Sequence, residues 1–507
     1  MKGFFRTVAV VTVFSISEKL LGFLYRIFMS RTIGAEGIGM YQVALSVFGL
    51  LFTVCASGTP ITVSRLMTKY KAENKPLKVE RVISAGLFST LIFAVPIVLM
   101  FFIFNNSLSF LFADERCKNI FLVILPGLIV TSVYSVLRGV FWGNKDFLPY
   151  SVIELLEELC MIIFGIFLIS FSNSVYQGAY RAGVAVLISY IFSFTLATIV
   201  FFIRKNKLRN PFPELKGLLS SSMPITAMRS ANSLAVSLVS IILPMRLIAS
   251  GMPEQLAITS FGAAVGQAIP LLFIPTTLIG SFTLVLVPEI SENFYKKNNL
   301  ALKNDIEKSL KISIFVSCGF IPVFTVLGNE IGLIVFDSVE CGKYLTISSF
   351  LMLFMSLSNI STSILNSIGL EKQTLIFYII SGVFMLLSIW FLPQFIGVYA
   401  LLVGFTFVYG LSTILNLILL NKKCPIKPKY FNFLISSAAI TLPIILFGFL
   451  LKNLLLTVLG EFFTLIIVGV LLCFLSVTLY ITFNLISFAS FRKRLKSIIP
   501  KRKIKNA

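Results

Sequence analysis

Long apolar segments and short polar segments alternate along nearly the whole chain, from Val8 to about Phe488. A bilayer core about 30 Å thick needs about 20 apolar residues for each helical crossing. The segments are apolar throughout rather than at every second residue, which favours helices over the strands of a barrel. The pattern predicts an all-α integral membrane protein with about 14 transmembrane helices, at residues 8–29, 41–60, 82–104, 119–142, 150–171, 182–203, 218–249, 258–288, 310–336, 344–366, 374–393, 396–420, 432–451 and 462–488.

The polar landmarks between these segments repeat at a spacing of about 228 residues. Pro60 and Pro288 each end a span that runs into a polar segment, and Gly143 and Gly369 follow them by 83 and 81 residues. Hydrophobic helices of similar length can also align by chance. We interpret the repeat as two six-helix lobes related by an axis along the membrane normal, an architecture of transporters with a substrate site between the lobes. The predicted parts are an N-lobe at 1–212, a C-lobe at 213–425, and two extra spans with a basic tail at 426–507.

The charge distribution predicts the orientation in the membrane. The chain carries 43 Lys and Arg against 21 Asp and Glu, for a net charge of +22. With the amino terminus in the cytoplasm, 32 basic residues fall in cytoplasmic segments and 6 in outer ones. This bias is the positive-inside rule and requires an even number of spans. We expect a protein of the cell membrane with both termini in the cytoplasm, whose basic tail contacts anionic membrane lipids and not nucleic acid.

Several kinds of chemistry are excluded by what the chain does not contain. It has no histidine, which excludes His-dependent acid–base catalysis, Ser-His-Asp triads and histidine metal ligands. The seven cysteines form no CxxC pair, so the sequence indicates neither a metal site nor a redox motif. Because no nucleotide-binding motif is present either, we expect no cofactor and no ATP-driven step.

Charged residues inside the predicted spans are the candidate binding residues, because each charge there needs a partner, water or a ligand. The first span carries two cations and one acid, and its repeat partner, span 7, carries two arginines. Arginine is suited to forked binding of phosphate oxygens. The alternative is an internal salt bridge, such as Glu18 with Arg229 across the lobes. The candidate substrate-binding residues are Arg26, Arg229, Lys19, Arg246, Glu18 and Asn232.

Other acids are interpreted as structural. Arg138 and Glu154 lie at similar depth on adjacent antiparallel spans, and we expect a structural ion pair between them. A coupling-ion site built on Glu154, Glu157 and Glu158 is the disfavoured alternative. Glu330 lies near a span end and is expected to be solvated.

Three stretches resemble the stage V sporulation protein B family of the multidrug/oligosaccharidyl-lipid/polysaccharide (MOP) superfamily: LLGFLYR at 20–26, RTIGAEGIGMYQ at 31–42 and SGTPITVSRL at 57–66. The resemblance implies a flippase that moves an undecaprenyl-pyrophosphate-linked saccharide, a peptidoglycan precursor or polysaccharide repeat unit, to the outer leaflet by alternating access. Related lipid II flippases carry essential arginines in helix 1; Arg26 matches one by motif, and Lys19 falls near another. Span 2, from Val43 to Pro60, departs from them because it has no charge. Cell-wall synthesis proteins are the partners implied.

Two other functions compete with the flippase. A drug or toxin exporter of the same superfamily would favour an acidic cavity for cationic drugs, whereas the predicted cavity is cationic. A membrane-bound polysaccharide polymerase or glycosyltransferase would need a loop domain or clustered acids. The outer connections are short and hold few acids, so we expect a transporter and not an enzyme.

The predicted topology can be tested with single cysteines introduced into the polar segments of a cysteine-free variant. Residues 65–81, 204–216, 296–311, 422–429 and 492–507 should react with a membrane-impermeant thiol reagent only after the membrane is opened. Labelling of the tail in intact cells would contradict an even number of spans.

Overall fold

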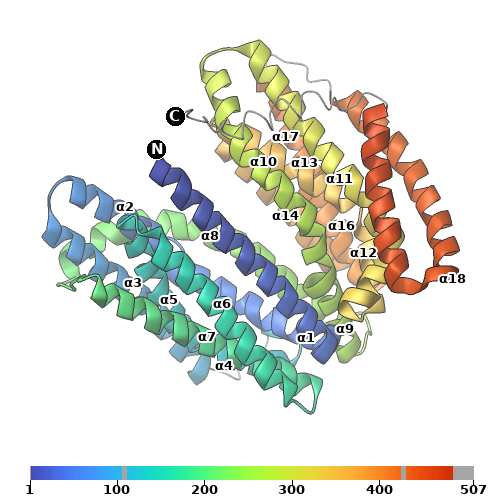
Figure 1. Cartoon of the computed structure of the whole chain (residues 1–507). Coiled ribbons are helices and arrows are strands. Elements are labelled where there is room, and N and C mark those ends of the chain that lie inside the picture. The colour runs from blue at the N-terminus through green and yellow to red at the C-terminus, as the bar shows by residue number, and fades with distance from the viewer. Residues whose placement is uncertain (1, 105–110, 424–429, 483–507) are drawn as a thin grey trace, which may run out of the picture. The chain divides into compact units, whose positions relative to one another are not determined.

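The structure, a computed structural model, describes residues 2–104, 111–423 and 430–482, and these residues form helices without strands (Figure 1). The loop 424–429 and the basic tail after residue 482 lie outside the described residues. The helices are α1 (Lys2–Ala56), α2 (Thr59–Ala72), α3 (Pro76–Ile103), α4 (Glu115–Ile124), α5 (Gly127–Gly143), α6 (Phe147–Ser170), α7 (Val175–Ile203), α8 (Phe212–Ala249), α9 (Glu254–Phe261), α10 (Ile269–Tyr295), α11 (Asn299–Phe336), α12 (Val339–Ser348), α13 (Leu351–Ser367), α14 (Glu371–Phe391), α15 (Pro393–Ile396), α16 (Ala400–Phe405), α17 (Ser412–Lys423) and α18 (Phe431–Thr482). Two π-helices, η2 (Gly262–Ala268) and η4 (Thr406–Leu411), and a 3-10 turn, η3 (Gly397–Tyr399), interrupt the spans.

These helices contain the predicted spans. Eight helical segments of the described chain are long and apolar enough to cross a membrane, or up to ten if each bent pair counts as one span. Two of the eight hold two predicted spans each: α1 turns at Gly34, with φ 66°, and α18 turns at Gly460, with φ 73°. Glycine adopts such positive φ angles without the steric cost that a side chain would add. The all-α membrane fold with about 14 helices is therefore confirmed.

Two bent helix pairs occupy corresponding places in the predicted repeat. Helices α4 and α5, of 10 and 17 residues, meet at 45°, and α12 and α13, also of 10 and 17 residues, meet at 58°. The two pairs begin 224 residues apart, at Glu115 and Val339. This match in length and spacing agrees with the repeat inferred from the sequence.

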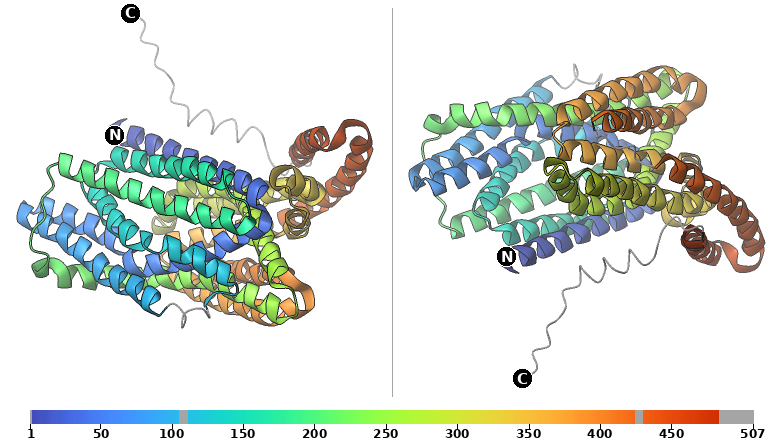
Figure 2. Two further views of the ribbon diagram at one scale, coloured as in Figure 1. Left: turned by 90° about the horizontal axis from the view of Figure 1, so that it is seen from below. Right: turned by 90° about the horizontal axis from the view of Figure 1, so that it is seen from above.

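The chain divides into two compact units. The first comprises Met1–Gln267 with Phe336–Ser338 and Leu386–Leu401, and the second comprises the remaining segments. In the first unit, α8 packs along α1, α2 and α3, and α6 lies beside α7 and α1. Figure 2 shows these helices, coloured blue to green, running alongside one another in both views. The lobe boundaries drawn from the sequence at 212 and 425 stay a prediction.

The second unit packs α10 against α13, and α13 against α17 and η4. A buried ion pair joins α18 to α11, because Lys452 Nζ lies 2.7 Å from Glu330 Oε1 and donates to the carbonyl of Val326 at 3.0 Å. The expectation that Glu330 is solvated was wrong: its side chain is 10% exposed. Sequence position places a residue near a span end, but it does not show which later helix covers it.

Helix α1 and the α9–η2 segment are in backbone contact. A Cβ atom at Gly262 would lie 1.9 Å from the carbonyl oxygen of Ala35, and one at Gly39 would lie 2.4 Å from that of Ile258. Small residues permit this close approach, which in a bilayer supplies packing energy between helices.

We predict that Gly262→Ala destabilises the protein, because its methyl group meets backbone that no rotamer change moves. The expected cost is about 1–3 kcal/mol, typical of overpacking. Gly49→Ala in α1 is the matched control, since a Cβ atom at Gly49 would meet nothing within 4 Å. Thermal unfolding of the purified protein in detergent should show a lower midpoint for Gly262→Ala alone. Equal midpoints would argue against the backbone contact.

Candidate functional site

Arg26 lies on α1 and contacts the π-helix of span 8. Its Nη1 donates to the carbonyl oxygen of Gly266 at 2.8 Å. A π-helix shifts the hydrogen-bond register by one residue, and such bulges occur frequently at functional sites. The next residue, Gln267, is fully buried and donates to Ser30 Oγ at 2.7 Å, while its Oε1 has no partner in the described part of the chain.

Arg229 lies on α8, opposite the break between α1 and α2. Its Nη1 donates to the carbonyl oxygen of Ser57 at 3.3 Å, and the side chain is otherwise exposed. Beside it, Thr226 Oγ1 accepts from the amide of Gly58 at 3.2 Å, and a Cβ at Gly58 would lie 2.4 Å from that oxygen. Within the described residues, neither Arg26 nor Arg229 forms an ion pair, and the alternative bridge from Glu18 to Arg229 is not formed.

The structure does not gather the other candidates around these two arginines. Lys19 is exposed on α1. Arg246 Nε donates to the carbonyl oxygen of Trp390 at 2.8 Å, and its guanidinium lies 4.8 Å from the Trp390 ring centroid. Arg246 thus binds the last turn of α14, where a cation complements the helix dipole. The side chain of Asn232 lies outside the described residues.

Glu18 lines a separate cavity of about 200 Å³ in the first unit, which we call the acid chamber. Arg138 and Glu154 also line it, with Nη1 3.4 Å from Oε1, at the geometry expected for a weak ion pair. The Arg138 guanidinium also lies 5.2 Å from the Trp142 ring centroid. The chamber is bounded by α1, α5, α6 and α7, and its lining residues are Glu18, Phe48, Phe52, Thr131, Tyr134, Ser135, Arg138, Glu154, Glu157, Glu158 and Tyr190.

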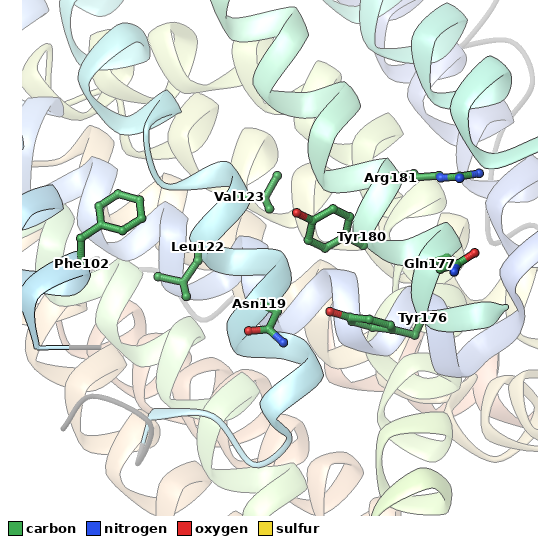
Figure 3. Close-up of a pocket in the computed structure, with 8 residues that line it drawn as sticks. All are labelled: Phe102, Asn119, Leu122, Val123, Tyr176, Gln177, Tyr180 and Arg181. Atoms are coloured by element: carbon green, nitrogen blue, oxygen red, sulfur yellow. The ribbon is translucent and has the colours of Figure 1, made fainter. Parts of the chain in front are cut away.

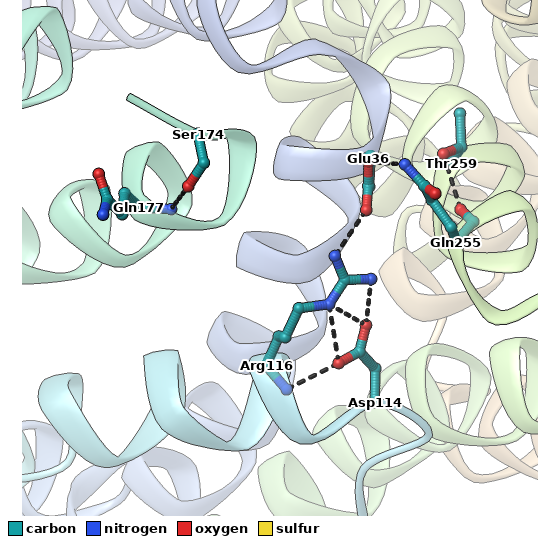
Figure 4. Close-up of polar contacts among 7 residues, drawn as sticks. All are labelled: Glu36, Asp114, Arg116, Ser174, Gln177, Gln255 and Thr259. Atoms are coloured by element: carbon teal, nitrogen blue, oxygen red, sulfur yellow. Dashed lines mark hydrogen bonds and ion pairs between the residues drawn. The ribbon is translucent and has the colours of Figure 1, made fainter. Parts of the chain in front are cut away.

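Sequence reasoning missed a polar cluster that joins α1, α4 and α9 (Figure 4). Arg116 Nη1 lies 2.7 Å from Glu36 Oε1, and Nη2 lies 2.8 Å from Asp114 Oδ2. Gln255 on α9 donates to Glu36 Oε2 at 2.9 Å, and Asp114 caps α4 by accepting from the amide of Arg116. These partners are up to 219 residues apart, so the fold alone brings them together.

A second feature that the sequence did not indicate is an open pocket of about 620 Å³ between α3, α4 and α7 (Figure 3). Tyr176 and Tyr180 lie on successive turns of α7, with ring centroids 6.2 Å apart. Arg181 donates from Nη1 to the carbonyl of Leu168 at 3.2 Å. Aromatic residues that combine an apolar ring with a polar group are typical of membrane interfaces.

Comparison with known proteins identifies the family. Residues 4–294 match the model of the family described as "Polysaccharide biosynthesis protein". The chain belongs to this family. Among its relatives, stage V sporulation protein B of Bacillus subtilis (strain 168) is 24% identical over 349 residues, covering 66% of this chain and 67% of that protein. Lipid II flippase MurJ of the same organism is 24% identical over 347 residues, covering 61% of each chain.

Solved structures show that this polysaccharide biosynthesis protein family member has the fold of MOP-superfamily transporters. Lipid II flippase MurJ in an inward closed conformation matches with a TM-score of 0.71 at 16% identity, covering 94% of this chain and all of that one. An inward-facing multidrug resistance MATE family transporter of the MOP superfamily matches with a TM-score of 0.64 at 15% identity, covering 80% and 94%. The resemblance drawn from the sequence motifs is confirmed, and the protein is a multi-pass protein of the cell membrane.

We predict that Arg138→Ala lowers the amount of folded protein in the membrane, because it leaves the Glu154 carboxylate without its cation partner. The exchange Arg138→Glu with Glu154→Arg should restore part of the loss, as measured by fluorescence-detected size-exclusion chromatography. Arg204→Ala is the control, since its 2.7 Å contact with Asp146 is half-exposed and surface pairs contribute about 0–1 kcal/mol. If the exchanged and single variants lost equal amounts of protein, the two residues would not be partners.

Proposed function

We propose that this member of the polysaccharide biosynthesis protein family is a flippase for an undecaprenyl-pyrophosphate-linked saccharide, moving it from the cytoplasmic to the outer leaflet by alternating access. The observation that carries the proposal is the state of two span arginines. Arg26 and Arg229 are each held by one backbone carbonyl, at 2.8 and 3.3 Å, and by no carboxylate in the described chain. Family membership and the fold shared with lipid II flippase MurJ support the same function.

A carbonyl orients a guanidinium but does not neutralise it. The positive charge inside the membrane is therefore stable only beside water or an anion. A lipid pyrophosphate supplies two charged groups with oxygens that match the guanidinium fork. In this proposal Arg26 and Arg229 bind the pyrophosphate, and the exposed Lys19 adds positive charge on the same helix as Arg26. Arg246 holds α8 against α14 through its contact with Trp390.

The membrane potential favours the proposed direction of transport. An inside-negative potential stabilises outward movement of an anionic headgroup by about 2.3 kcal/mol per charge per 100 mV. This requires the cytoplasmic orientation of both termini proposed from the charge distribution.

The second candidate function is export of cationic drugs or toxins. One observation favours it: the acid chamber holds four glutamates and one arginine, which suits cationic ligands. The fold is shared with a multidrug resistance MATE family transporter, although with a lower TM-score than with lipid II flippase MurJ. Energy-dependent efflux of a cationic dye from cells that express the protein would support the exporter.

We predict that Arg26→Ala and Arg229→Ala each abolish translocation of a pyrophosphate-linked lipid while membrane abundance stays near normal. Arg→Lys at either position should restore little activity, because a point charge does not fork onto two phosphate oxygens. Arg209→Ala is the matched control, since Arg209 pairs with Glu80 at 3.0 Å and is half-exposed. The measurement is translocation of a labelled lipid in proteoliposomes.

Two outcomes would count against the proposed roles. Normal translocation by both alanine variants would refute anion binding by these arginines. Failure of both variants to reach the membrane, with Arg209→Ala unaffected, would make the two arginines structural.

A further inference from the structure

The acid chamber carries more negative charge than its surroundings balance. Glu154 lies near Arg138, the one cation that lines the chamber among the described residues. Glu18 and Glu158 form no ion pair within the described chain, and the neighbouring Lys19 is exposed on α1. Four carboxylates against one guanidinium in a half-enclosed cavity need a further cation or protons.

The position of Glu158 is fixed by close packing with α1. A Cβ at Gly22 would lie 2.8 Å from Glu158 Oε1, so glycine leaves the space in which this carboxylate lies against α1. Glu18 lies one helical turn from Gly22, also on α1. The two acids interact electrostatically across the contact between α1 and α6, which places two like charges on one side of the chamber.

An independent observation points to a ligand in the chamber. Tyr134, which lines it, is only 5% exposed, and its hydroxyl has no hydrogen-bond partner in the described part of the chain. A buried hydroxyl normally finds a partner, because leaving it unpaired costs about 1–3 kcal/mol. A donor group bound in the chamber would satisfy the Tyr134 oxygen.

The lining distinguishes between an inorganic and an organic cation. Hard metal ions prefer shells made of six or more oxygens. Within the described residues, no group of three or more acids or cysteines is arranged to hold a metal ion. Four aromatic rings line the chamber instead, and those of Phe48 and Tyr190 stack at 5.6 Å. Aromatic faces with nearby carboxylates are the setting in which proteins bind organic ammonium groups.

We propose that the acid chamber binds the ammonium group of a small organic amine, with Glu18 and Glu158 as its charge partners and the rings of Phe48, Tyr134 and Tyr190 around its carbon atoms. The volume of about 200 Å³ corresponds to about seven water molecules at about 30 Å³ each, which suits a short aminoalkyl group. This site goes beyond the proposed function, because it recognises a cation and does not depend on the arginines that bind pyrophosphate.

The charge of the chamber also favours one source of the ammonium group. A phosphoethanolamine headgroup carries a phosphate close to its ammonium, and the four carboxylates would repel that phosphate. An aminoalkyl group without an attached phosphate brings no such charge. The amine is therefore expected on an alkyl chain that carries no attached phosphate.

The test is isothermal titration of the full chain in lipid nanodiscs at pH 7 with n-butylamine hydrochloride. We expect saturable binding of one amine per chain, and no saturable binding of sodium chloride, phosphoethanolamine or the neutral analogue 1-butanol. Glu158→Gln and Glu18→Gln should each weaken amine binding at least tenfold. Glu115→Gln is the control, because Glu115 is 82% exposed on α4, and it should bind as the unchanged chain does.

Several results would overturn the proposal. Equal binding of sodium would indicate an inorganic cation site, equal binding of 1-butanol an apolar pocket, and equal binding of phosphoethanolamine a lipid headgroup site. Unchanged amine binding in folded Glu158→Gln and Glu18→Gln would place the amine elsewhere. If both glutamine variants fail to fold, Tyr134→Phe decides, since loss of its hydroxyl should weaken binding and unchanged binding would refute the site. Arg26→Ala should keep amine binding. A failure of the flippase proposal can therefore be told apart from a failure of the amine site.

Discussion

The cost of placing a charge inside a bilayer is the constraint on which the rest of the structure depends. Each cation in a span must meet a carboxylate, a dipole, water or a ligand. Arg138 meets Glu154 and Lys452 meets Glu330, at 3.4 and 2.7 Å, and both contacts join two helices. Among the described residues, Arg26 and Arg229 meet only carbonyl oxygens. Cations paired with a carboxylate hold two helices together, whereas cations that meet a carbonyl keep a charge that a ligand can neutralise.

The same constraint explains why acids and cations occupy different places in the first unit. The acids of α6 line a cavity with Glu18, whereas Arg26 on α1 contacts the π-helix η2 and Arg229 on α8 contacts the break between α1 and α2. If Glu158 lay beside Arg26, the pair would be neutral and neither group would attract a ligand. Gly22 makes room for the Glu158 carboxylate against α1, and the register shift of η2 supplies the Gly266 carbonyl that Arg26 contacts. The Glu158 and Arg26 charges therefore have separate partners. The separation is consistent with distinct sites for an anion and for a cation.

Much of the fold could be predicted from the sequence, because span length and charge bias follow directly from the bilayer. The 14 segments follow from hydropathy and landmark spacing, whereas the bends between α4 and α5 and between α12 and α13 fall inside single predicted spans and were not predicted. The positive-φ turns at Gly34 and Gly460 sit in short connections that pattern alone leaves ambiguous. Long-range polar contacts could not be predicted from the sequence. Glu36 and Arg116 are 80 residues apart, and nothing local to either residue specifies the other. Glu330 was misplaced for the same reason, since its partner Lys452 lies on a helix added after the repeat.

The central claim is that Arg26 and Arg229, two span arginines held by carbonyl oxygens and by no carboxylate of the described chain, select an anionic lipid-linked headgroup. The most direct measurement compares translocation of labelled lipid II with that of a glycolipid of similar size and neutral headgroup, in proteoliposomes holding the unchanged chain. We predict that lipid II crosses when the potential is negative on the side from which the lipid starts. The neutral lipid should cross no faster than it does in empty vesicles. Equal rates for the two lipids, or transport of the neutral lipid alone, would contradict this claim.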